Sequence, residues 1–224
     1  PDINKFRELK LRLLNGTHTF SCGPAFLAGF PTVKEAMQDD TFRAFVSGLM
    51  LHEIAPLIVS GEITAAESNA FAQQVIDRFR NVYIEHLWIN ITVQYTSKMA
   101  MRNLPLLQKY YSMHQAVPEL MALGFAAYIL FMKSEATADG RYQGTHNGKT
   151  YIIQDDKAAV LSGKWKSSGE KEIVQAILED ETLWGKDLTQ YSGFAGTVKS
   201  YVTLLAENDV MTILRSVITK QSVA

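Results

Sequence analysis

The longest apolar run, from Leu120 to Met132, is the feature that most constrains how this chain can fold. The run reads Leu-Met-Ala-Leu-Gly-Phe-Ala-Ala-Tyr-Ile-Leu-Phe-Met. A membrane-spanning helix needs about 20 predominantly apolar residues, so this run is too short to cross a bilayer. Because it is apolar on every side and Pro118 suits its first turn, the run predicts a helix buried on all faces. Other elements must then pack around it.

The composition favours a single globular domain over residues 1–224. Hydrophobic residues make up 47% of the 224 residues and charged residues 20%, as in ordinary globular proteins. No Gly-, Ser- or Pro-rich linker divides the chain. The 22 Lys and Arg residues nearly balance the 23 Asp and Glu residues. We therefore expect neither nucleic acid nor a membrane surface as a partner.

The cysteine count and the N-terminus favour a cytoplasmic setting. Cys22 has no second cysteine with which to form an internal disulfide, and the sequence shows no secretory leader. Cys22 is either a reactive thiol or a small buried side chain, and the second role is the more common. Because the chain begins with Pro1 rather than methionine, we expect it to be processed or cut from a longer protein.

Helix signals recur along most of the chain. The apolar spacing and capping residues predict helices that start after Asn4, after Asp40 or Thr41 with a bend or end at Pro56, after Thr64 in a capping box with Glu67, over 84–101, and after Asn103 with Pro105 in the first turn. After the core helix, whose pattern stops near Glu135, three more are predicted: one behind a second capping box of Ser167 and Glu170, one over 194–207 and one over 209–219.

One segment has a different period. Residues 141–154 alternate around Asn147-Gly148, a pair that suits the positive φ angles of a type I′ turn, and so predict a β-hairpin. The expected fold class is therefore mainly α, a multi-helical domain with one small β-hairpin.

Most catalytic and metal-binding signatures are absent from the sequence. It has no phosphate-binding glycine motif, no nucleophile elbow and no pair of cysteines for zinc. His52-Glu53 lacks the second histidine of a helical zinc site, because Pro56 occupies that position. We expect no metal in this chain.

The segment Lys10-Leu-Arg-Leu-Leu-Asn15-Gly-Thr-His18 departs from this pattern. On a regular α-helix Asn15 lies about 140° and His18 about 80° around the axis from Lys10, so the three share a broad face. An amine, an amide and an imidazole can converge there on one small polar ligand. The alternative is a solvated lysine, an asparagine that ends a helix and a buried structural histidine.

The segment from Lys10 to Gly29 resembles the catalytic helix of the long-chain mannitol dehydrogenase family, whose motif is Lys, four residues, Asn, two residues, His. Three later segments resemble family segments in the same order: 50–56, 78–86 and Ser97-Lys98. The resemblance implies a multi-helical C-terminal domain similar to that of 6-phosphogluconate dehydrogenase.

Within the family, the sequence is most similar to the tagaturonate reductase branch, whose members are also called altronate oxidoreductases. The resemblance rests on residues 15–23, residues 86–98 and the tail that ends Ile153-Gln-Asp-Asp156. Val82 stands where many members have proline, and Asn90 where polyol-oxidising members have an arginine that contacts substrate. The change at Asn90 implies a different substrate.

The resemblance also implies roles for individual residues. Lys10 would be the acid and base, Asn15 would stabilise the developing alkoxide, and His18 would position the substrate or Lys10. A lysine acts as a base near neutral pH only where burial or a nearby cation lowers its pKa from the usual value of about 10.4. For a sugar-acid carboxylate the candidates are Lys98 and Arg102, one helical turn apart; solvated cations are the alternative.

Other matched residues receive structural roles. We assign His86 to a hydrogen bond at a helix end, and Arg78 and Asn81 to maintenance of the fold.

Family members bind NAD through an N-terminal dinucleotide domain, which is absent from this chain. The cofactor-binding residues are therefore expected elsewhere, and the isolated chain is expected to be inactive. Two alternatives remain. One is a related fructuronate, mannonate or polyol dehydrogenase. The other is a non-catalytic helical interaction module, for which a Lys10 extended into solvent would be evidence.

Overall fold

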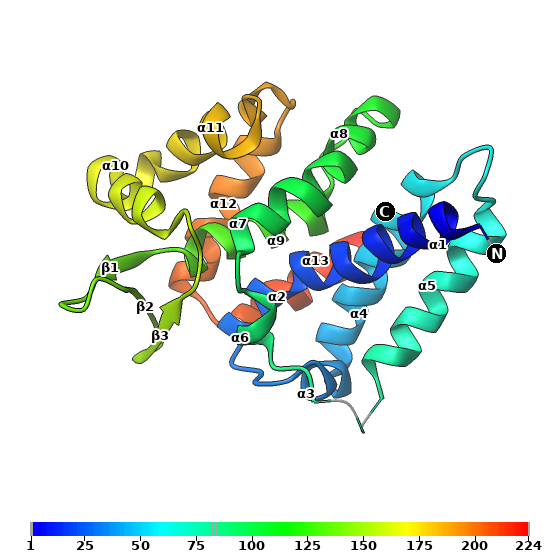
Figure 1. Cartoon of the computed structure of the whole chain (residues 1–224), viewed down its shortest axis with the longest axis horizontal. Helices are drawn as coiled ribbons and strands as arrows, with labels where there is room; N and C mark the ends of the chain where they lie inside the picture. The colour runs from blue at the N-terminus through cyan, green and yellow to red at the C-terminus, as the bar shows by residue number, and fades with distance from the viewer. Residues whose placement is uncertain (1, 82, 84, 224) are drawn as a thin grey trace.

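The computed structural model describes residues 2–81, 83 and 85–223. Figure 1 shows helices around a central helix, with a small sheet at one side. The first helix runs without a break through α1 (Ile3–Leu9), the π-helical segment η1 (Lys10–Gly16) and α2 (Thr17–Leu27). Its N-cap is Asp2, whose carboxylate accepts from the amides of Asn4 and Lys5. The prediction of Asn4 as the cap was wrong by two residues, because the Asp2 carboxylate satisfies these amides.

The second predicted helix begins and ends close to the expected residues. It consists of α4 (Asp40–Gly48), the π-helical η2 (Leu49–Ile54) and the 3₁₀ turn η3 (Ala55–Ile58). Pro56 in η3 has no N–H to continue the helical bonding, which explains the change of helix type. A short helix before it, α3 (Val33–Gln38), was not predicted.

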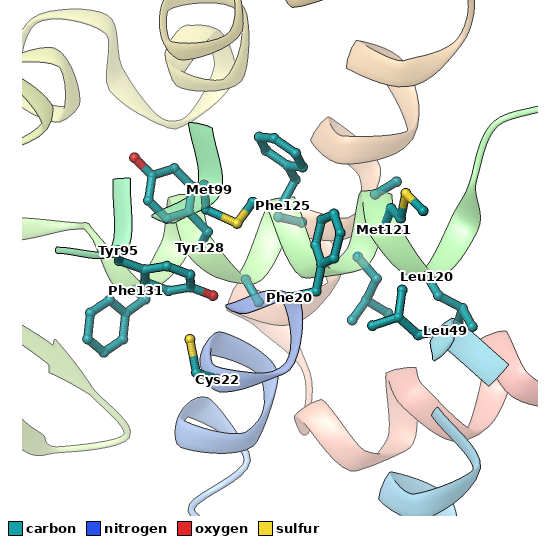
Figure 2. Close-up of a cluster of buried hydrophobic side chains, with 14 of the residues drawn as sticks. Phe20, Cys22, Leu49, Tyr95, Met99, Leu120, Met121, Phe125, Tyr128 and Phe131 are labelled. Carbon is teal, nitrogen blue, oxygen red and sulfur yellow. The ribbon is translucent and has the colours of Figure 1, made fainter. Parts of the chain in front are cut away.

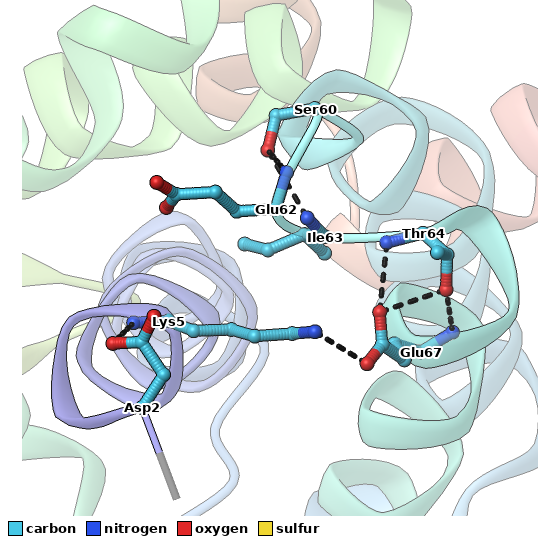
Figure 3. A network of polar contacts seen from close by, with 7 residues as sticks. All are labelled: Asp2, Lys5, Ser60, Glu62, Ile63, Thr64 and Glu67. Carbon is cyan, nitrogen blue, oxygen red and sulfur yellow. Dashed lines mark hydrogen bonds and ion pairs between the residues drawn. The ribbon is translucent and has the colours of Figure 1, made fainter.

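The predicted capping box of Thr64 and Glu67 is confirmed at the start of α5 (Ala65–Phe79). Figure 3 shows the Glu67 carboxylate bonded to the amide and hydroxyl of Thr64 and also paired with Lys5 of α1. These contacts lower the pKa of Glu67 to about 2, with the Lys5 bond as the largest cause. The box thus also ties α5 to the N-terminal helix.

The stretch predicted as one helix over 84–101 is instead broken into three pieces. These are α6 (Trp88–Ile91), α7 (Tyr95–Lys98) and the π-helical η4 (Met99–Asn103), after which α8 (Leu104–Met113) continues the chain. The break lies at Gln94, which has a left-handed backbone (φ 53°). Its amide N–H donates to the Gln154 carbonyl and its side chain bonds Asp156. Hydrogen bonds to residues at the end of the hairpin therefore override the helical pattern of the local sequence.

The apolar run forms α9 (Glu119–Phe131), and every residue from Leu120 to Phe131 is buried. Pro118 is its N-cap rather than part of its first turn, and the helix ends four residues before Glu135. Figure 2 shows the core that surrounds it, where Phe20 and Cys22 of α2 face Phe125, Tyr128 and Phe131 of α9.

Two glycines allow α2 and α9 to approach closely. A Cβ at Gly124 would lie 2.8 Å from the Phe20 ring and 2.9 Å from its carbonyl oxygen. A Cβ at Gly23 would lie 3.2 Å from the carbonyl carbon of Ala127 in α9. It would also lie 2.7 Å from the hydroxyl of Tyr95 in α7, which accepts a hydrogen bond from the Gly23 amide. The catalytic-helix candidate is therefore fixed against the centre of the core.

The predicted hairpin is present as part of a three-stranded antiparallel sheet in the order β1-β2-β3. Its strands are β1 (Ser134–Ala136), β2 (Tyr142–His146) and β3 (Lys149–Ile153). Asn147 and Gly148 both have positive φ angles, as predicted for the turn. The strand β1 was missed because three residues are too few to show a period of two.

The remaining helices are α10 (Ala158–Leu178), α11 (Glu181–Trp184), the 3₁₀ turn η5 (Leu188–Gln190), α12 (Phe194–Glu207) and α13 (Val210–Val223). The capping box predicted at Ser167 is not formed, since its hydroxyl donates to the Lys164 carbonyl. The chain instead turns at Gly169 (φ 65°) between two helical stretches of α10. Within the described ranges no helix combines the length and apolarity that crossing a membrane requires.

Candidate active site

Asn15 and His18 line the same cavity, which has a volume of about 230 Å³. The first helix supplies one side of it, and the end of α5 and the segment around His86 supply the others. Its lining residues are Leu14, Asn15, His18, Val33, Arg78, Phe79, His86 and Ile91. The structure thus brings together two of the three residues of the predicted motif.

His18 is held in place by aromatic contacts. Its imidazole stacks on the Phe79 ring at a centroid distance of 4.0 Å and an interplanar angle of 3°. The Trp88 ring meets it edge-on at 6.0 Å, and the His86 ring lies 6.3 Å away. The Nε2 atom of His18 is buried and has no hydrogen-bond partner within the described residues. A buried polar atom without a partner is costly, so this nitrogen is available to a ligand.

The surroundings of His18 keep it neutral. Burial lowers the pKa of His18 to about 3, and neighbouring positive charge contributes further. The groups that contribute this charge, in decreasing order, are His86, Arg102, Arg78 and Lys98. A neutral imidazole offers one hydrogen-bond donor and one acceptor, and does not supply a proton at neutral pH.

Lys10 lies on the same helix but is exposed, and it is not among the residues that line the cavity. Its ammonium group makes no hydrogen bond or ion pair within the described part of the chain, and the Asn15 carboxamide makes none there either. Both residues belong to η1, whose N–H groups bond the carbonyl five residues back rather than four. Such a helix turns less than the 100° per residue of an α-helix. Asn15 and His18 therefore lie closer to the face of Lys10 than the regular helix predicts.

The two cations predicted to bind a carboxylate lie on neighbouring turns of the segment α7–η4. Lys98 Nζ donates to the Ile91 carbonyl at 2.9 Å, and Arg102 Nη1 donates to the Thr19 hydroxyl at 3.2 Å. Burial, as the largest cause, lowers the pKa of both groups. Neither forms an ion pair with an acidic side chain within the described residues, although the charge of Asp155 partly opposes the lowering of the Lys98 pKa.

Arg78 and His86 contribute to the cavity, which the sequence did not indicate. The exposed Arg78 side chain lines the cavity and forms no ion pair among the described residues. The His86 backbone carbonyl accepts from the Val33 amide at the start of α3, so the expected helix-end bond comes from the main chain. Its imidazole lines the cavity. The Asn81 side chain accepts from the Tyr83 amide, a local turn contact.

Of the two positions where the sequence departs from the family pattern, only Asn90 lies within the described residues. Asn90 is an exposed residue of α6 and does not line the cavity. Val82 lies outside the described residues.

Two other candidates for chemistry, Cys22 and Glu53, have structural roles. Cys22 is fully buried, which raises the pKa of its thiol to about 12. The buried Glu53 carboxylate accepts the amides of Leu120 and Met121 at 2.8 Å each, and so caps α9. Among the residues that the structure describes, no three His, Cys, Asp or Glu side chains are grouped so as to hold a metal ion.

Two further contacts, from the buried Asn103 and the half-buried Arg12, join the site segments and were missed in the sequence. Neither has a motif, because each contact joins residues more than 80 positions apart. Asn103 bonds the backbone of the first helix, and Arg12 bonds the backbone of η4.

The chain is similar to known proteins in sequence and in fold. Residues 2–206 match the family model described as mannitol dehydrogenase C-terminal domain. The altronate oxidoreductase of Pectobacterium carotovorum is 33% identical over 213 residues, which is 92% of this chain and 42% of the relative. That of Escherichia coli is 32% identical over 221 residues, 96% of this chain and 43% of the relative. The chain thus spans less than half the length of these relatives.

A solved structure has the same fold. The Pseudomonas fluorescens mannitol 2-dehydrogenase, in a ternary complex with NAD and D-mannitol, superposes with a TM-score of 0.81 at 25% identity. The match covers 98% of this chain and 42% of that one. The resemblance stated from the sequence, including its altronate oxidoreductase branch, is confirmed by these matches, as is the mainly α fold class.

Proposed function

The chain belongs to the mannitol dehydrogenase C-terminal domain family, and from this premise we propose that it is the substrate-side half of an NAD-dependent oxidoreductase. The reaction we assign is the interconversion of D-tagaturonate and D-altronate, by analogy with relatives that carry the name altronate oxidoreductase. Because those relatives are more than twice as long as the matched region, the complete activity requires a second, N-terminal domain.

The observation that carries the proposal is the unpartnered Nε2 of a neutral His18 in the cavity that Asn15 also lines. A substrate carbonyl or hydroxyl would satisfy both polar side chains. The positive charge of Lys98, Arg102 and Arg78 around His18 further favours a substrate that is an anion. A sugar acid provides both the carbonyl and the carboxylate.

In the proposed mechanism this chain manages the proton. During reduction, Lys10 donates a proton to the substrate oxygen, and during oxidation it accepts one from the hydroxyl. The Asn15 amide donates a hydrogen bond to the same oxygen as negative charge develops there. His18, which stays neutral, orients the oxygen through Nε2. Lys10 is exposed in this chain, so the proposal requires the second domain to cover it and enclose the substrate.

We place the nucleotide site outside this chain. A dinucleotide is usually held where a parallel strand leads through a glycine-rich turn into a helix N-terminus. The strands described here are antiparallel and are joined by tight turns. NAD would supply or accept the hydride, and we assign its binding to the N-terminal domain.

Lys98 and Arg102 are proposed to bind the substrate carboxylate. The Lys98 ammonium group and the Arg102 guanidinium group form no ion pair within the described residues. Charge-assisted bonds to a carboxylate are among the stronger hydrogen bonds in proteins, so both groups could bind one. Replacing either by Met should raise KM for tagaturonate with less effect on a ketose that has no carboxylate. An equal loss on both substrates would contradict this role.

The test of the function uses the full-length protein with its nucleotide-binding domain. The wild type, mixed with tagaturonate and NADH, should consume NADH, and Lys10→Met should lower kcat by about 10²- to 10⁴-fold with little change in KM. Lys199→Met, at an exposed position of α12, is the matched control and should retain full activity. Activity of the Lys10 variant equal to wild type would refute the role of Lys10.

Turnover assays of the full-length protein also distinguish two alternatives. Faster turnover of fructuronate or a polyol than of tagaturonate would retain the chemistry but change the substrate. One observation favours a non-catalytic interaction module. The Lys10 side chain is exposed and forms no hydrogen bond with the side chain of Asn15 or His18. The absence of contact concerns only the side chains, and that alternative predicts no turnover with any of these substrates, even when the nucleotide domain is present.

A further inference from the structure

The cavity at His18 has a lining of one sign of charge. Among the described residues that line it, Arg78 carries a permanent positive charge and none is an aspartate or a glutamate. Glu85, which precedes the lining residue His86, pairs instead with Lys34 of α3 at 3.0 Å. The described lining therefore contains no counter-ion for Arg78.

Arg78 is brought to the cavity by the helix α5. It lies in the last turn of this helix, directly before Phe79. The buried Phe79 ring stacks on the His18 imidazole at a centroid distance of 4.0 Å, and this contact holds the end of α5 against the first helix. The charge of Arg78 is near enough to His18 to contribute to the lowering of the His18 pKa.

The guanidinium group of Arg78 is free to bind a ligand. It forms no hydrogen bond and no ion pair with any residue that the structure describes. Two other arginines contrast with it. Arg12 bonds Glu8 and two backbone carbonyls, and Arg43 pairs with Asp40 and also bonds a backbone carbonyl. All five N–H donors of Arg78 thus remain available.

Lys98 and Arg102 differ from Arg78 in two respects. Neither is among the residues that line this cavity. Each also donates to an acceptor of the protein, Lys98 to the Ile91 carbonyl and Arg102 to the Thr19 hydroxyl. A carboxylate has about four acceptor sites, so more than one cation can bind it. Of these three cations, Arg78 is the one that lines the cavity with free donors.

We propose that Arg78 is a specificity-determining residue, which selects acidic substrates by binding their carboxylate in the cavity that contains His18. A planar guanidinium group matches the two oxygens of a carboxylate and binds both at once. A ketose or polyol without a carboxylate gains nothing from this group. The inference rests on the proposed function, since it states which substrates the same site admits.

A purely structural role of Arg78 makes different predictions. An arginine in the last turn of a helix also stabilises the helix through its carbonyls and its dipole. Loss of that role would lower stability and affect all substrates equally, and lysine would replace arginine, because the positive charge is retained. Selection of a carboxylate instead affects acidic substrates alone, and lysine replaces arginine only in part, because it lacks the planar fork.

The experiment compares Arg78→Met and Arg78→Lys with wild type in the full-length protein. Arg80→Met is the matched control, since Arg80 is an exposed arginine at the C-cap of the same helix but lines a different cavity. The first readout is kcat and KM with NADH and either tagaturonate or D-fructose, a ketose that has no carboxylate. The second is urea unfolding, which reports any effect on the fold.

A third readout is independent of turnover. Calorimetry in the presence of NADH measures binding of D-altronate and of altritol, the matching hexitol without a carboxylate. Neither alcohol can transfer a hydride to a cofactor that is already reduced, so only binding is observed. Wild type should bind altronate more tightly than altritol, and Arg78→Met should lose most of this preference.

The expected effect is on KM rather than on kcat. For Arg78→Met, KM for tagaturonate should rise about 10-fold, at the lower end for a charge-assisted bond because Arg78 is exposed. The kinetics with D-fructose should change by less than about twofold. Arg78→Lys should fall between Arg78→Met and wild type, and Arg80→Met should equal wild type.

The outcomes separate the inference from the function. An Arg78→Met protein with an unchanged KM for tagaturonate, or with equal losses on tagaturonate and D-fructose, overturns the inference. If that variant does not fold, Arg78→Lys decides, and a KM for tagaturonate equal to that of wild type overturns it. A wild type that turns over no sugar acid refutes the proposed function. Calorimetry then tests Arg78 separately, and equal binding of altronate and altritol by wild type overturns its role.

Discussion

The low pKa of His18 predicts how the stability of the protein changes with pH. Burial, followed by the positive charge of His86, Arg102, Arg78 and Lys98, lowers this pKa from 6.5 to about 3 in the folded chain. The unfolded chain therefore binds a proton at His18 more readily than the folded chain does. Stability is complete above pH 6.5 and falls as the pH decreases through the window from 6.5 to about 3.

The size of the effect follows from the two pKa values. A shift of this size is equivalent to about 2 kcal/mol of lost unfolding free energy between pH 7 and pH 5. We therefore expect an effect of about 1–2 kcal/mol. In urea this corresponds to a shift of the unfolding midpoint of about 0.5–1 M.

The assay compares urea unfolding of wild type and His18→Gln at pH 7 and pH 5. Other groups titrate in both proteins, including His146, whose pKa is also lowered by burial, so only the difference between the two proteins is used. Wild type should lose about 1–2 kcal/mol more than the variant on going to pH 5. His52→Gln, at an exposed histidine, should behave as wild type. Equal pH dependence of wild type and His18→Gln would refute a neutral His18.

Three further predictions concern activity and stability. The isolated chain of residues 1–224, mixed with tagaturonate and NADH, should leave the NADH absorbance unchanged; measurable turnover would mean that it binds the cofactor itself. Gly124→Ala should lower the unfolding free energy by about 1–3 kcal/mol, because its methyl group would collide with Phe20. Gly163→Ala is the matched control: it also lies in a helix but has no atom within 4 Å of the new Cβ, so it should be stabilising by up to about 1 kcal/mol. Glu53→Gln leaves one acceptor oxygen for two amides at the start of α9 and should cost about 1–3 kcal/mol in urea unfolding; an unchanged midpoint would mean that this cap does not contribute.

The sequence predicted those elements whose causes are local. Thr64 and Glu67 form their capping box within four residues, and Asn147-Gly148 form their turn within two, so both were correctly identified. The run in α9 could be predicted because apolarity on every face has one structural explanation. By contrast, the break at Gln94 depends on Gln154 and Asp156, about 60 residues away. Nothing in the local sequence encodes that contact.

The residues of the candidate site likewise include some that local sequence predicts and some that only the fold brings together. Asn15 and His18 could be predicted from motif spacing, whereas Arg78 and His86 enter the cavity only because the end of α5 and the following segment fold over the first helix. Arg78 lies in a segment that resembles the family and was assigned to maintenance of the fold. Its position relative to His18 could not be derived from sequence separation.

The helical geometry of the motif shows why the regular-helix calculation was incomplete. The π-helical segments η2 and η4 are each followed, two residues later, by a proline that lacks an N–H, and this local cause can be recognised in a sequence. The segment η1 has no such proline: Gly16 is followed by seven residues before Pro24. Its wider turn therefore has no local cause that can be recognised in the sequence. The angle between Lys10 and Asn15 consequently could not be calculated from the period of a regular α-helix.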